Sequence, residues 1–246
     1  MERSSWDWIQ LFLSEYGGAF LKGAENTMTI ALISTLIGCI IGFAVGIIQS
    51  ITLEPEENAV KRFLLRFVKL ILNVYVEVFR GTPMMVQAMV VYYGSSTLFG
   101  WDLDAMAASY LVVSVNTGAY MAETVRGGIM SVSSGQVEAS KALGMHHFDT
   151  MTRVVLPQAL LSILPQICNN LIINIKDTSV LSVISCTELF FVTSSAVGTY
   201  YRYFEPFAIT CAIYMVLTFV TSRILRIFEK KLQGTSSYQV VSDYQR

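Results

Sequence analysis

Two polar side chains near the end of a long apolar run, Asn174 and Asp177, have the types and spacing to bind a small polar ligand. They are three residues apart, so on a helix they lie on one face, whereas Lys176 points elsewhere. A carboxylate can meet an ammonium group, and an amide can donate a hydrogen bond to a carboxylate. The same side chains could instead hydrogen-bond the end of a helix, and their spacing leaves both interpretations open.

Two pairs of opposite charges have the same spacing. Glu77 precedes Arg80 by three residues, and Glu123 likewise precedes Arg126, so each pair could form an ion pair on one helical face. One interpretation is that these pairs fix helix ends near the inner face of a membrane. The other is that they line a cavity, because ionisable side chains are costly in lipid and usually face a cavity or a partner.

Enzymatic chemistry and metal binding have no comparable pattern. The adjacent histidines, His146 and His147, point to different sides of a helix, which is poor geometry for one metal ion. The sequence has no GxxxxGK[ST] phosphate loop and no nucleophile paired with a base. The 4 cysteines lie in or beside apolar segments, so we expect buried free thiols rather than a disulfide or zinc framework. We therefore expect no catalytic residue, no metal and no cofactor in this chain.

The composition indicates that the elements positioning these side chains lie in lipid. Of the 246 residues, 53% are hydrophobic and 14% are charged, whereas soluble domains have about 25% charged residues. The mean hydropathy is +0.53. The 17 basic and 18 acidic residues nearly balance, which argues against nucleic acid as a partner. We expect an all-α membrane protein.

A membrane-spanning helix needs about 20 apolar residues, and several uncharged runs meet this requirement, the last only just. They cover residues 26–53, 81–101, 105–122, 154–175 and 206–222. The second span could begin earlier, near Leu70, which would place the first charged pair inside it. Pro83 would interrupt this span, and a broken helix is tolerated at membrane depth only beside protein or a watery cavity. Asn116 and Thr117 place hydrogen-bonding groups in the third span.

The amino terminus and the loop charges predict the orientation. Residues 1–22 have no basic start and no small-residue cleavage site, so we expect a short interfacial helix rather than a cleaved signal peptide. Trp6 and Trp8 suit the membrane surface, and Phe12 and Phe20 suit the apolar side of that helix. Most Lys and Arg residues lie in loops that are cytoplasmic if the amino terminus is outside, and five crossings then place the carboxy terminus inside.

A polar insert, "GQVEASKALGMHHFDTMTRVVLPQAL", separates two apolar blocks. Ser133 followed by Gln136 fits a capping box, and most residues from Gln136 to Leu143 are good helix formers. Gly144 can end that helix as a left-handed cap, and a second short helix can then run toward Pro157. The insert is either a solvated connector or a docking element for another protein.

This insert resembles the EAA loop of the permease subunits of bacterial ABC importers. The matching residues are Glu138, Ala139 and Ser140, then Gly144, then Val155, Leu156 and Pro157. Ser140 replaces an alanine of the family pattern, and His146 and Asp149 replace a serine and a glutamine that are often found there. The stretches "EVFRGTPMMVQ", "AYMAETVRGGI" and "NIKDTSVLSVI" are similar to the polar amino acid uptake branch of the family. Together the motifs cover roughly residues 20–230.

The resemblance implies a type I ABC importer permease with five transmembrane helices and a cytoplasmic EAA-loop helix, in the bacterial cytoplasmic membrane. The transmembrane domain would cover residues 23–230, with the EAA loop at about 131–157 and a cytoplasmic tail at 231–246. In the family a separate ATPase dimer, which binds ATP and Mg²⁺, receives the EAA-loop helix. The residues assigned to ATPase coupling are Glu138, Ala139, Ser140 and Gly144. The other implied partners are a second permease, identical or similar, and an extracellular amino acid-binding protein.

For the substrate, the resemblance implies a polar amino acid. Asn174 and Asp177 are the predicted substrate-binding residues, with Glu77, Asn116 and Thr117 as weaker candidates. Two acids beside one pathway favour a neutral or cationic amino acid over an acidic one.

Two other functions remain open on the sequence alone. An ion-coupled secondary carrier usually has internal repeats built around broken helices, and no convincing repeat is present. Dependence of uptake on ATP rather than on an ion gradient separates it from an ABC importer. A non-transporting membrane scaffold or sensor would purify without an associated ATPase or a bound amino acid.

Overall fold

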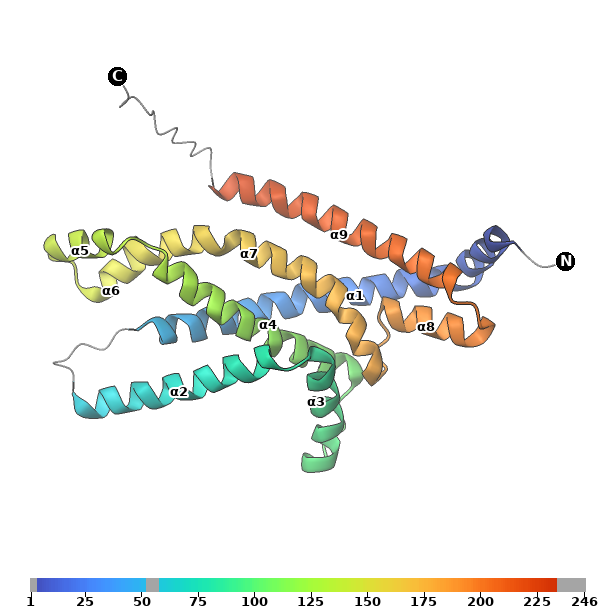
Figure 1. The fold of residues 1–246 in the computed structure, drawn as a ribbon, viewed down its shortest axis with the longest axis horizontal. Helices are drawn as coiled ribbons and strands as arrows, with labels where there is room; N and C mark the ends of the chain where they lie inside the picture. Colours follow the sequence, from blue (N-terminus) through green and yellow to red (C-terminus); the bar gives the residue numbers. More distant parts are fainter. Residues whose placement is uncertain (1–3, 52–57, 234–246) are drawn as a thin grey trace, which may run out of the picture.

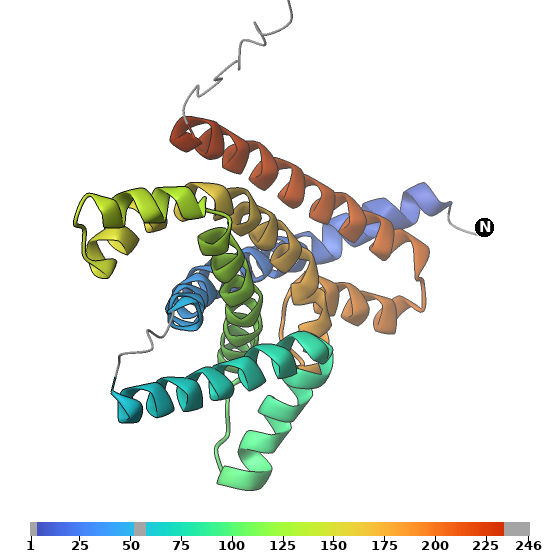
Figure 2. The same ribbon diagram turned by 60° about the vertical axis from the view of Figure 1, so that its left-hand side comes forward.

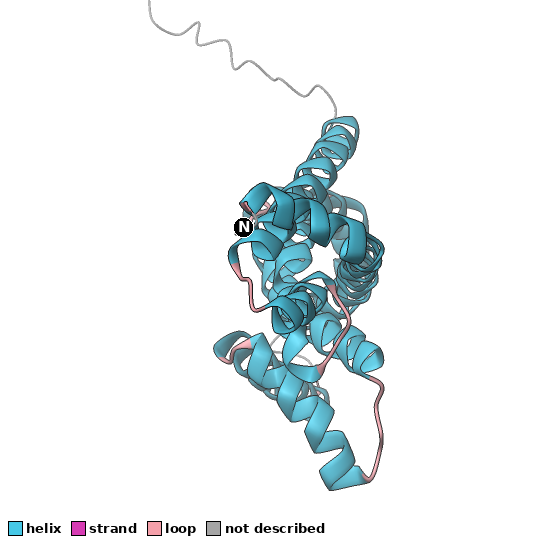
Figure 3. Cartoon of the chain, turned by 90° about the vertical axis from the view of Figure 1, so that its right-hand side faces the viewer, coloured by secondary structure: helices cyan, strands magenta, loops and turns pink. Residues whose placement is uncertain are grey.

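Helices make up the regular structure of the described residues. The computed structural model describes residues 4–51 and 58–233, and no strand occurs in them. The helices are α1 (Ser5–Ser50), α2 (Ala59–Gly81), α3 (Met84–Phe99), α4 (Ala105–Met130), α5 (Ser134–Ala142), α6 (His147–Thr150), α7 (Leu156–Asp177), α8 (Leu189–Tyr200) and α9 (Phe204–Gln233). A π-helical segment, Met151–Val155, precedes α7, and a 3₁₀ segment, Thr178–Ile184, follows it. The longest helices run roughly along one axis and α3 turns across it (Figure 1, Figure 3), so the predicted all-α class is confirmed.

Some of the predicted spans correspond to helices that are long and apolar enough to cross a membrane. In the described part of the chain, 3 segments meet this requirement: Ser5–Ser50, His147–Ile184 and Phe204–Leu232. The other two predicted spans correspond to α3, which has only 16 residues, and to α4, which is not one of the three. The count of five spans therefore stays a prediction. Residues 52–53 of the predicted first span and 234–246 of the predicted tail lie outside the described residues.

Helix α1 is continuous from Ser5 to Ser50, so the separate surface helix expected within residues 1–22 is wrong. A capping box at Ser4 begins the helix: the Asp7 N–H donates to the Ser4 hydroxyl at 3.3 Å, and the Ser4 N–H donates to the Asp7 carboxylate at 2.9 Å. Phe12 and Phe20 are fully buried in a cluster with residues of α8 and α9. This packing against two other helices keeps the first turns of α1 in line with the rest.

Glycines let α1 and α4 pack closely. Gly38, Gly42 and Gly46 are four residues apart and all three face α4. A Cβ added at Gly38 would lie 2.6 Å from Cβ of Thr117, and one at Gly46 would lie 2.7 Å from Cβ of Val125. Small residues at this spacing let helix backbones approach closely in membrane proteins. The contact fixes the register of α4 against α1.

The predicted interruption at Pro83 is confirmed. Helix α2 ends at Gly81, and α3 begins at Met84 in a new direction (Figure 1). The last carbonyl groups of α2 lose their helical partners at such a break. The Gln87 side-chain amide replaces those partners, because it donates to the carbonyl oxygens of Phe79 and Thr82, both at 2.9 Å.

The polar insert folds as α5 and α6, which lie at one end of the molecule (Figure 2). Gly144 has φ +78°, so the predicted left-handed cap is confirmed. The predicted capping box is wrong, because the Ser133 side chain makes no capping hydrogen bond. The Gln136 side chain is engaged elsewhere: its amide oxygen accepts a hydrogen bond from the Gln158 amide of α7 at 2.5 Å.

The second short helix, expected to stop near Pro157, is instead the start of a long one. Helix α6 passes through the π-helical segment directly into α7, and Pro157 lies in the first turn of α7. Because helical turns precede Pro157, the N–H that proline lacks leaves a carbonyl group of those turns without its helical partner. The π-helical turn lets the helix continue past it.

Candidate functional site

A polar cavity of about 230 Å³ lies between α4 and α7; we call it the α4–α7 cavity. Helix α4 contributes Asn116, Thr117, Tyr120 and Thr124, and α7 contributes Gln166, Asn170, Ile173, Asn174 and Asp177. On each helix these positions recur at three- and four-residue intervals, so two polar helical faces meet. The structure thus brings together four of the five predicted substrate-binding residues, all except Glu77.

Asn174 connects three helices at the wall of this cavity. Its side chain is only 6% exposed. Its amide nitrogen donates to the hydroxyl of Thr35 in α1 at 2.8 Å and to the hydroxyl of Thr117 in α4 at 3.0 Å. Burying an amide without partners would be costly, so these bonds hold the helices in one arrangement. Asn174 and Thr117 therefore shape the cavity, and the donor groups of the Asn174 amide are already used within the chain.

Asp177 differs from its neighbours in being free to meet a ligand. It is the last residue of α7, it is exposed, and its carboxylate has no hydrogen bond or ion pair with another described residue. The carboxyl end of a helix carries a partial negative charge, so a carboxylate there is unfavourable until a cation meets it. The neighbouring Lys176 side chain lines other cavities, beside α9. Asp177 is thus suited to bind an ammonium group.

Asn116 links the cavity to the break between α2 and α3. Its amide nitrogen donates to the Phe79 carbonyl oxygen at 3.1 Å and to the Gln87 amide oxygen at 3.0 Å. Gln87 is 7% exposed and was missed by the sequence analysis. Its position four residues after Pro83 was the available signal, because a break leaves carbonyl groups within reach of a nearby amide.

Glu77, the fifth predicted residue, lines a different cavity of about 420 Å³. This α2–α4 cavity is lined by Gln49 at the end of α1, by Lys69, Asn73, Val76, Glu77 and Arg80 of α2, and by Glu123 and Arg126 of α4. The expected pairing of Glu77 with Arg80 is wrong, because Arg80 pairs with Glu123 across the two helices. Glu123 also lies 3.8 Å from Arg126, so the second expected pair is confirmed.

The predicted coupling residues lie on and beside α5. Glu138, Ala139 and Gly144 are exposed, and so is Leu143, with 83% of its surface accessible. Ser140 is 5% exposed, and its hydroxyl donates to the Gln136 carbonyl oxygen at 2.7 Å. Ser140 therefore faces into this chain, while the other three residues are accessible to a partner.

Glu188 is a second residue that the sequence analysis missed. Its side chain is fully buried, at 0% exposure, just before α8. The carboxylate accepts hydrogen bonds from the N–H groups of Phe190 and Phe191, both at 2.7 Å, and from the Tyr214 hydroxyl at 3.1 Å. An acidic residue directly before an apolar helix was the available signal, because carboxylates cap helix amino termini. Glu188 holds α8 against α9.

Comparison with protein families gives a match over most of the chain. A family model described as "Binding-protein-dependent transport system inner membrane component" matches residues 59–234. The chain is 34% identical over 214 residues to the arginine transport system permease protein ArtQ of Bacillus subtilis, covering 87% of this chain and 92% of the relative. It is 33% identical over 226 residues to the octopine transport system permease protein OccM of Rhizobium radiobacter, covering 89% and 87%.

Solved structures match over a similar length. A crystal structure of an amino acid ABC transporter with histidines is similar with a TM-score of 0.79 and 32% identity, covering 94% of this chain and 100% of the other. An inward-facing structure of the MetNI methionine ABC transporter has a TM-score of 0.72 at 17% identity, covering 88% and 97%. At that identity the second match concerns the fold alone.

Proposed function

Because this chain belongs to the family of binding-protein-dependent transport system inner membrane components, we propose that it is the permease subunit of an ATP-driven importer of a polar amino acid. Its fold is that of type I ABC importer permeases. Similar permeases are named for arginine, octopine and glutamine. The chain forms the translocation path, and its substrate is a neutral or cationic amino acid.

The observation that carries this proposal is the α4–α7 cavity with Asp177 at its edge. Its volume of about 230 Å³ is below the roughly 300–1,000 Å³ that is typical of sites for drug-sized ligands, so it suits a small substrate. Asp177 meets the ammonium group, and the amides and hydroxyls around it meet the carboxylate. Asp177 is the one charged residue of the lining, so an acidic side chain on the substrate is disfavoured. Glu77 faces the other cavity and does not contribute to this preference.

The exposed face of α5 receives the ATPase. Glu138, Ala139 and Gly144 contact a cleft of the partner, while Ser140 faces into this chain. The sequence has no phosphate loop, so ATP and Mg²⁺ are bound by the partner. The two states of the ATPase dimer must bind this face with different affinities. With equal affinities, ATP hydrolysis could not shift the equilibrium between the inward-open and outward-open permease.

The complete importer holds two permeases, two ATPases and an extracellular binding protein in the bacterial cytoplasmic membrane. The second permease is a copy of this chain or a similar one. The transmembrane domain covers residues 23–230 and crosses the membrane five times. The amino-terminal segment, residues 1–22, lies at the outer face, and the carboxy-terminal tail from residue 231 lies inside.

The test is uptake of labelled arginine and glutamine into proteoliposomes that contain this permease, its ATPase and its binding protein. We expect uptake of at least one of them to depend on ATP and not on an ion gradient. The Asp177→Asn variant removes the charge at nearly constant size. It should raise KM by about tenfold, since a hydrogen bond to a charged group contributes about 1.5–3 kcal/mol.

The matched control is Asp102→Asn, which removes an exposed carboxylate outside both cavities. Uptake by this variant should equal that of the wild type. An unchanged KM in Asp177→Asn would remove Asp177 from the site, and uptake that follows an ion gradient would contradict the importer itself.

A further inference from the structure

One turn of α4 separates the two polar cavities. Tyr120 lines the α4–α7 cavity, and Glu123, three residues later, lines the α2–α4 cavity. Arg80 of α2 spans this boundary, because its guanidinium lies 5.5 Å from the centre of the Tyr120 ring and its side chain pairs with Glu123. The aromatic ring, the cation and the carboxylate therefore form a small cluster where the cavities approach each other.

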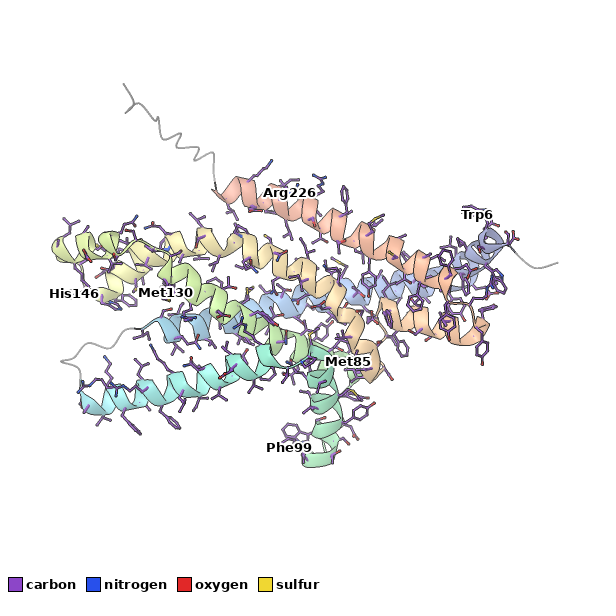
Figure 4. The ribbon with its side chains drawn as sticks, viewed as in Figure 1. Trp6, Met85, Phe99, Met130, His146 and Arg226 are labelled. Atoms are coloured by element: carbon purple, nitrogen blue, oxygen red, sulfur yellow. The ribbon has the colours of Figure 1, made fainter. Side chains whose placement is uncertain are left out.

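The α2–α4 cavity lies on the α5 side of this cluster. It is lined by Gln49, which is next to the end of α1, and by Arg126, in the part of α4 that leads to α5. Figure 4 shows Met130, at the end of α4, and His146, after α5, toward the same end of the molecule, with Trp6 at the opposite end. A substrate that leaves the α4–α7 cavity toward α5 therefore passes Tyr120 and Arg80.

We propose that the Arg80–Glu123 ion pair, stacked on Tyr120, is the gate between the two cavities, and that the leaving amino acid opens it by replacing each partner with its own opposite charge. This inference rests on the proposed function. The carboxylate of the substrate takes the place of Glu123 beside Arg80, and its ammonium group takes the place of Arg80 beside Glu123. The α2–α4 cavity is then the exit site for a zwitterionic amino acid.

The exposure of the pair fits an exchangeable contact. The side chains of Arg80 and Glu123 are 39% and 40% exposed. An ion pair in contact with water contributes little free energy, so a substrate can replace one of its partners at small cost. Replacing one partner of a fully buried ion pair would strongly destabilise the protein. The Tyr120 ring keeps the guanidinium at the boundary through a cation–π contact, so the gate re-forms after the substrate has passed.

The charges of the exit site also fit a zwitterion. The cavity is lined by basic Lys69, Arg80 and Arg126 and by acidic Glu77 and Glu123. Lys69 is already engaged, because its ammonium group donates to the carbonyl oxygens of Gln49 and Ile51 at the end of α1, at 2.8 and 2.5 Å. Arg126 is held by a longer contact, 3.8 Å from Glu123, so it becomes available when the substrate occupies Glu123. Glu77 provides the opposite charge beyond the gate.

The substrate cavity and the gate are also connected through the backbone. Asn116, in the α4–α7 cavity, donates to the carbonyl oxygen of Phe79, the residue directly before Arg80. A ligand that competes for the Asn116 amide therefore acts on the backbone that carries the gate arginine.

The experiment measures ATP-independent leak of labelled glutamine and arginine from proteoliposomes that contain the whole importer. Glu123→Gln keeps the shape of the side chain and removes its charge, and Arg80→Gln removes the opposite charge. Each should increase the leak about fivefold. Loss of an exposed ion pair costs up to about 1 kcal/mol, which raises the population of the open gate by about this factor. Tyr120→Ala keeps the ion pair and removes the ring beneath Arg80, so it should leak more than the wild type and less than the single charge variants. The swapped variant, Arg80→Glu with Glu123→Arg, also keeps an ion pair without this stacking and should leak about as much as Tyr120→Ala.

The control is Glu25→Gln, which removes the pairing of an exposed Lys22–Glu25 ion pair of α1, with N–O distance 2.8 Å, outside both cavities. Its leak should equal that of the wild type. If Glu123→Gln, Arg80→Gln and Tyr120→Ala leak no more than the wild type while ATP-driven uptake by the wild type is intact, the gate is wrong and the proposed function stands. If the wild-type importer takes up neither amino acid, the proposed function itself fails.

Discussion

The α4–α7 cavity and the exposed face of α5 are held in place by opposite means. The cavity depends on contacts between helices distant in the chain: Asn174 hydrogen-bonds Thr35 and Thr117 from two other helices. Helix α5 has 9 residues and only one of them, Ser140, is buried. The shape of the cavity therefore depends on the packing of several helices. The exposed residues of α5 make few contacts within the chain, so a substitution there should leave the packing of the other helices unchanged.

We therefore expect substitutions in these two regions to affect different properties of the protein. Changes around the cavity should alter folding or substrate binding, because they act on packed contacts between helices. Changes on the exposed face of α5 should leave folding intact and alter the link between ATP hydrolysis and transport. Three substitutions test this separation, beginning with the largest effect.

The largest effect is expected from Gly42→Ala. A Cβ at this position would overlap the Met121 side chain of α4, and overpacking of this kind costs about 1–3 kcal/mol or more. Thermal unfolding of the purified protein in detergent should show a clearly lower midpoint. The matched substitution on α5 is Ala142→Val, at an exposed position, where surface changes usually stay within about 0.5 kcal/mol. Equal losses of stability in the two variants would contradict the comparison.

A smaller effect, of another kind, is expected from Glu138→Arg. The charge of an exposed α5 residue is reversed, which should weaken docking of the ATPase by about 1.4 kcal/mol, equivalent to a tenfold change in affinity. Uptake in vesicles should fall at least about tenfold at unchanged expression and unfolding temperature. Glu25→Arg is the control, because it reverses an exposed charge on α1. Full transport by Glu138→Arg would remove α5 from the coupling role.

The smallest effect is expected from Ser140→Ala, which also restores the alanine of the EAA pattern. The Ser140 hydroxyl bonds the carbonyl oxygen of Gln136, four residues earlier in its own helix. Such a bond slightly disfavours the helix, and alanine is a better helix former than serine, so the substitution should change stability by less than about 0.7 kcal/mol. ATPase-driven uptake should stay within the error of the measurement. A large loss of coupling would mean that Ser140 turns outward to contact the partner.

The sequence predicted those features of the cavity that depend on one helix. The three-residue spacing of Asn174 and Asp177 predicts one helical face with the groups to bind an amino acid. Asn116 and Thr117 place hydrogen-bonding groups within an apolar run, and the structure brings all four to one cavity. It did not predict which helices would meet. The spacing of Glu77 and Arg80 favoured a local pair, but α4 presents Glu123 to Arg80 and leaves Glu77 on a different cavity wall.

The capping box is a second case in which a distant contact replaced a local one. Ser133 and Gln136 have the correct types and spacing. The Gln136 side chain instead bonds Gln158, 22 residues later in the chain. A local pattern is informative only as long as no tertiary contact competes for the same side chain.

Features that depend on one residue and its near neighbours follow from the sequence. The break at Pro83 follows from a missing N–H, and the left-handed turn at Gly144 follows from a missing Cβ. Which polar groups meet across the bundle depends on how the helices pack. Asn174 and Thr35 are 139 residues apart in the chain, and they meet because glycines set the distance between α1 and α4 while α7 packs against both. Helical periodicity places a side chain on a face, but only the packing of all the helices determines what that face meets.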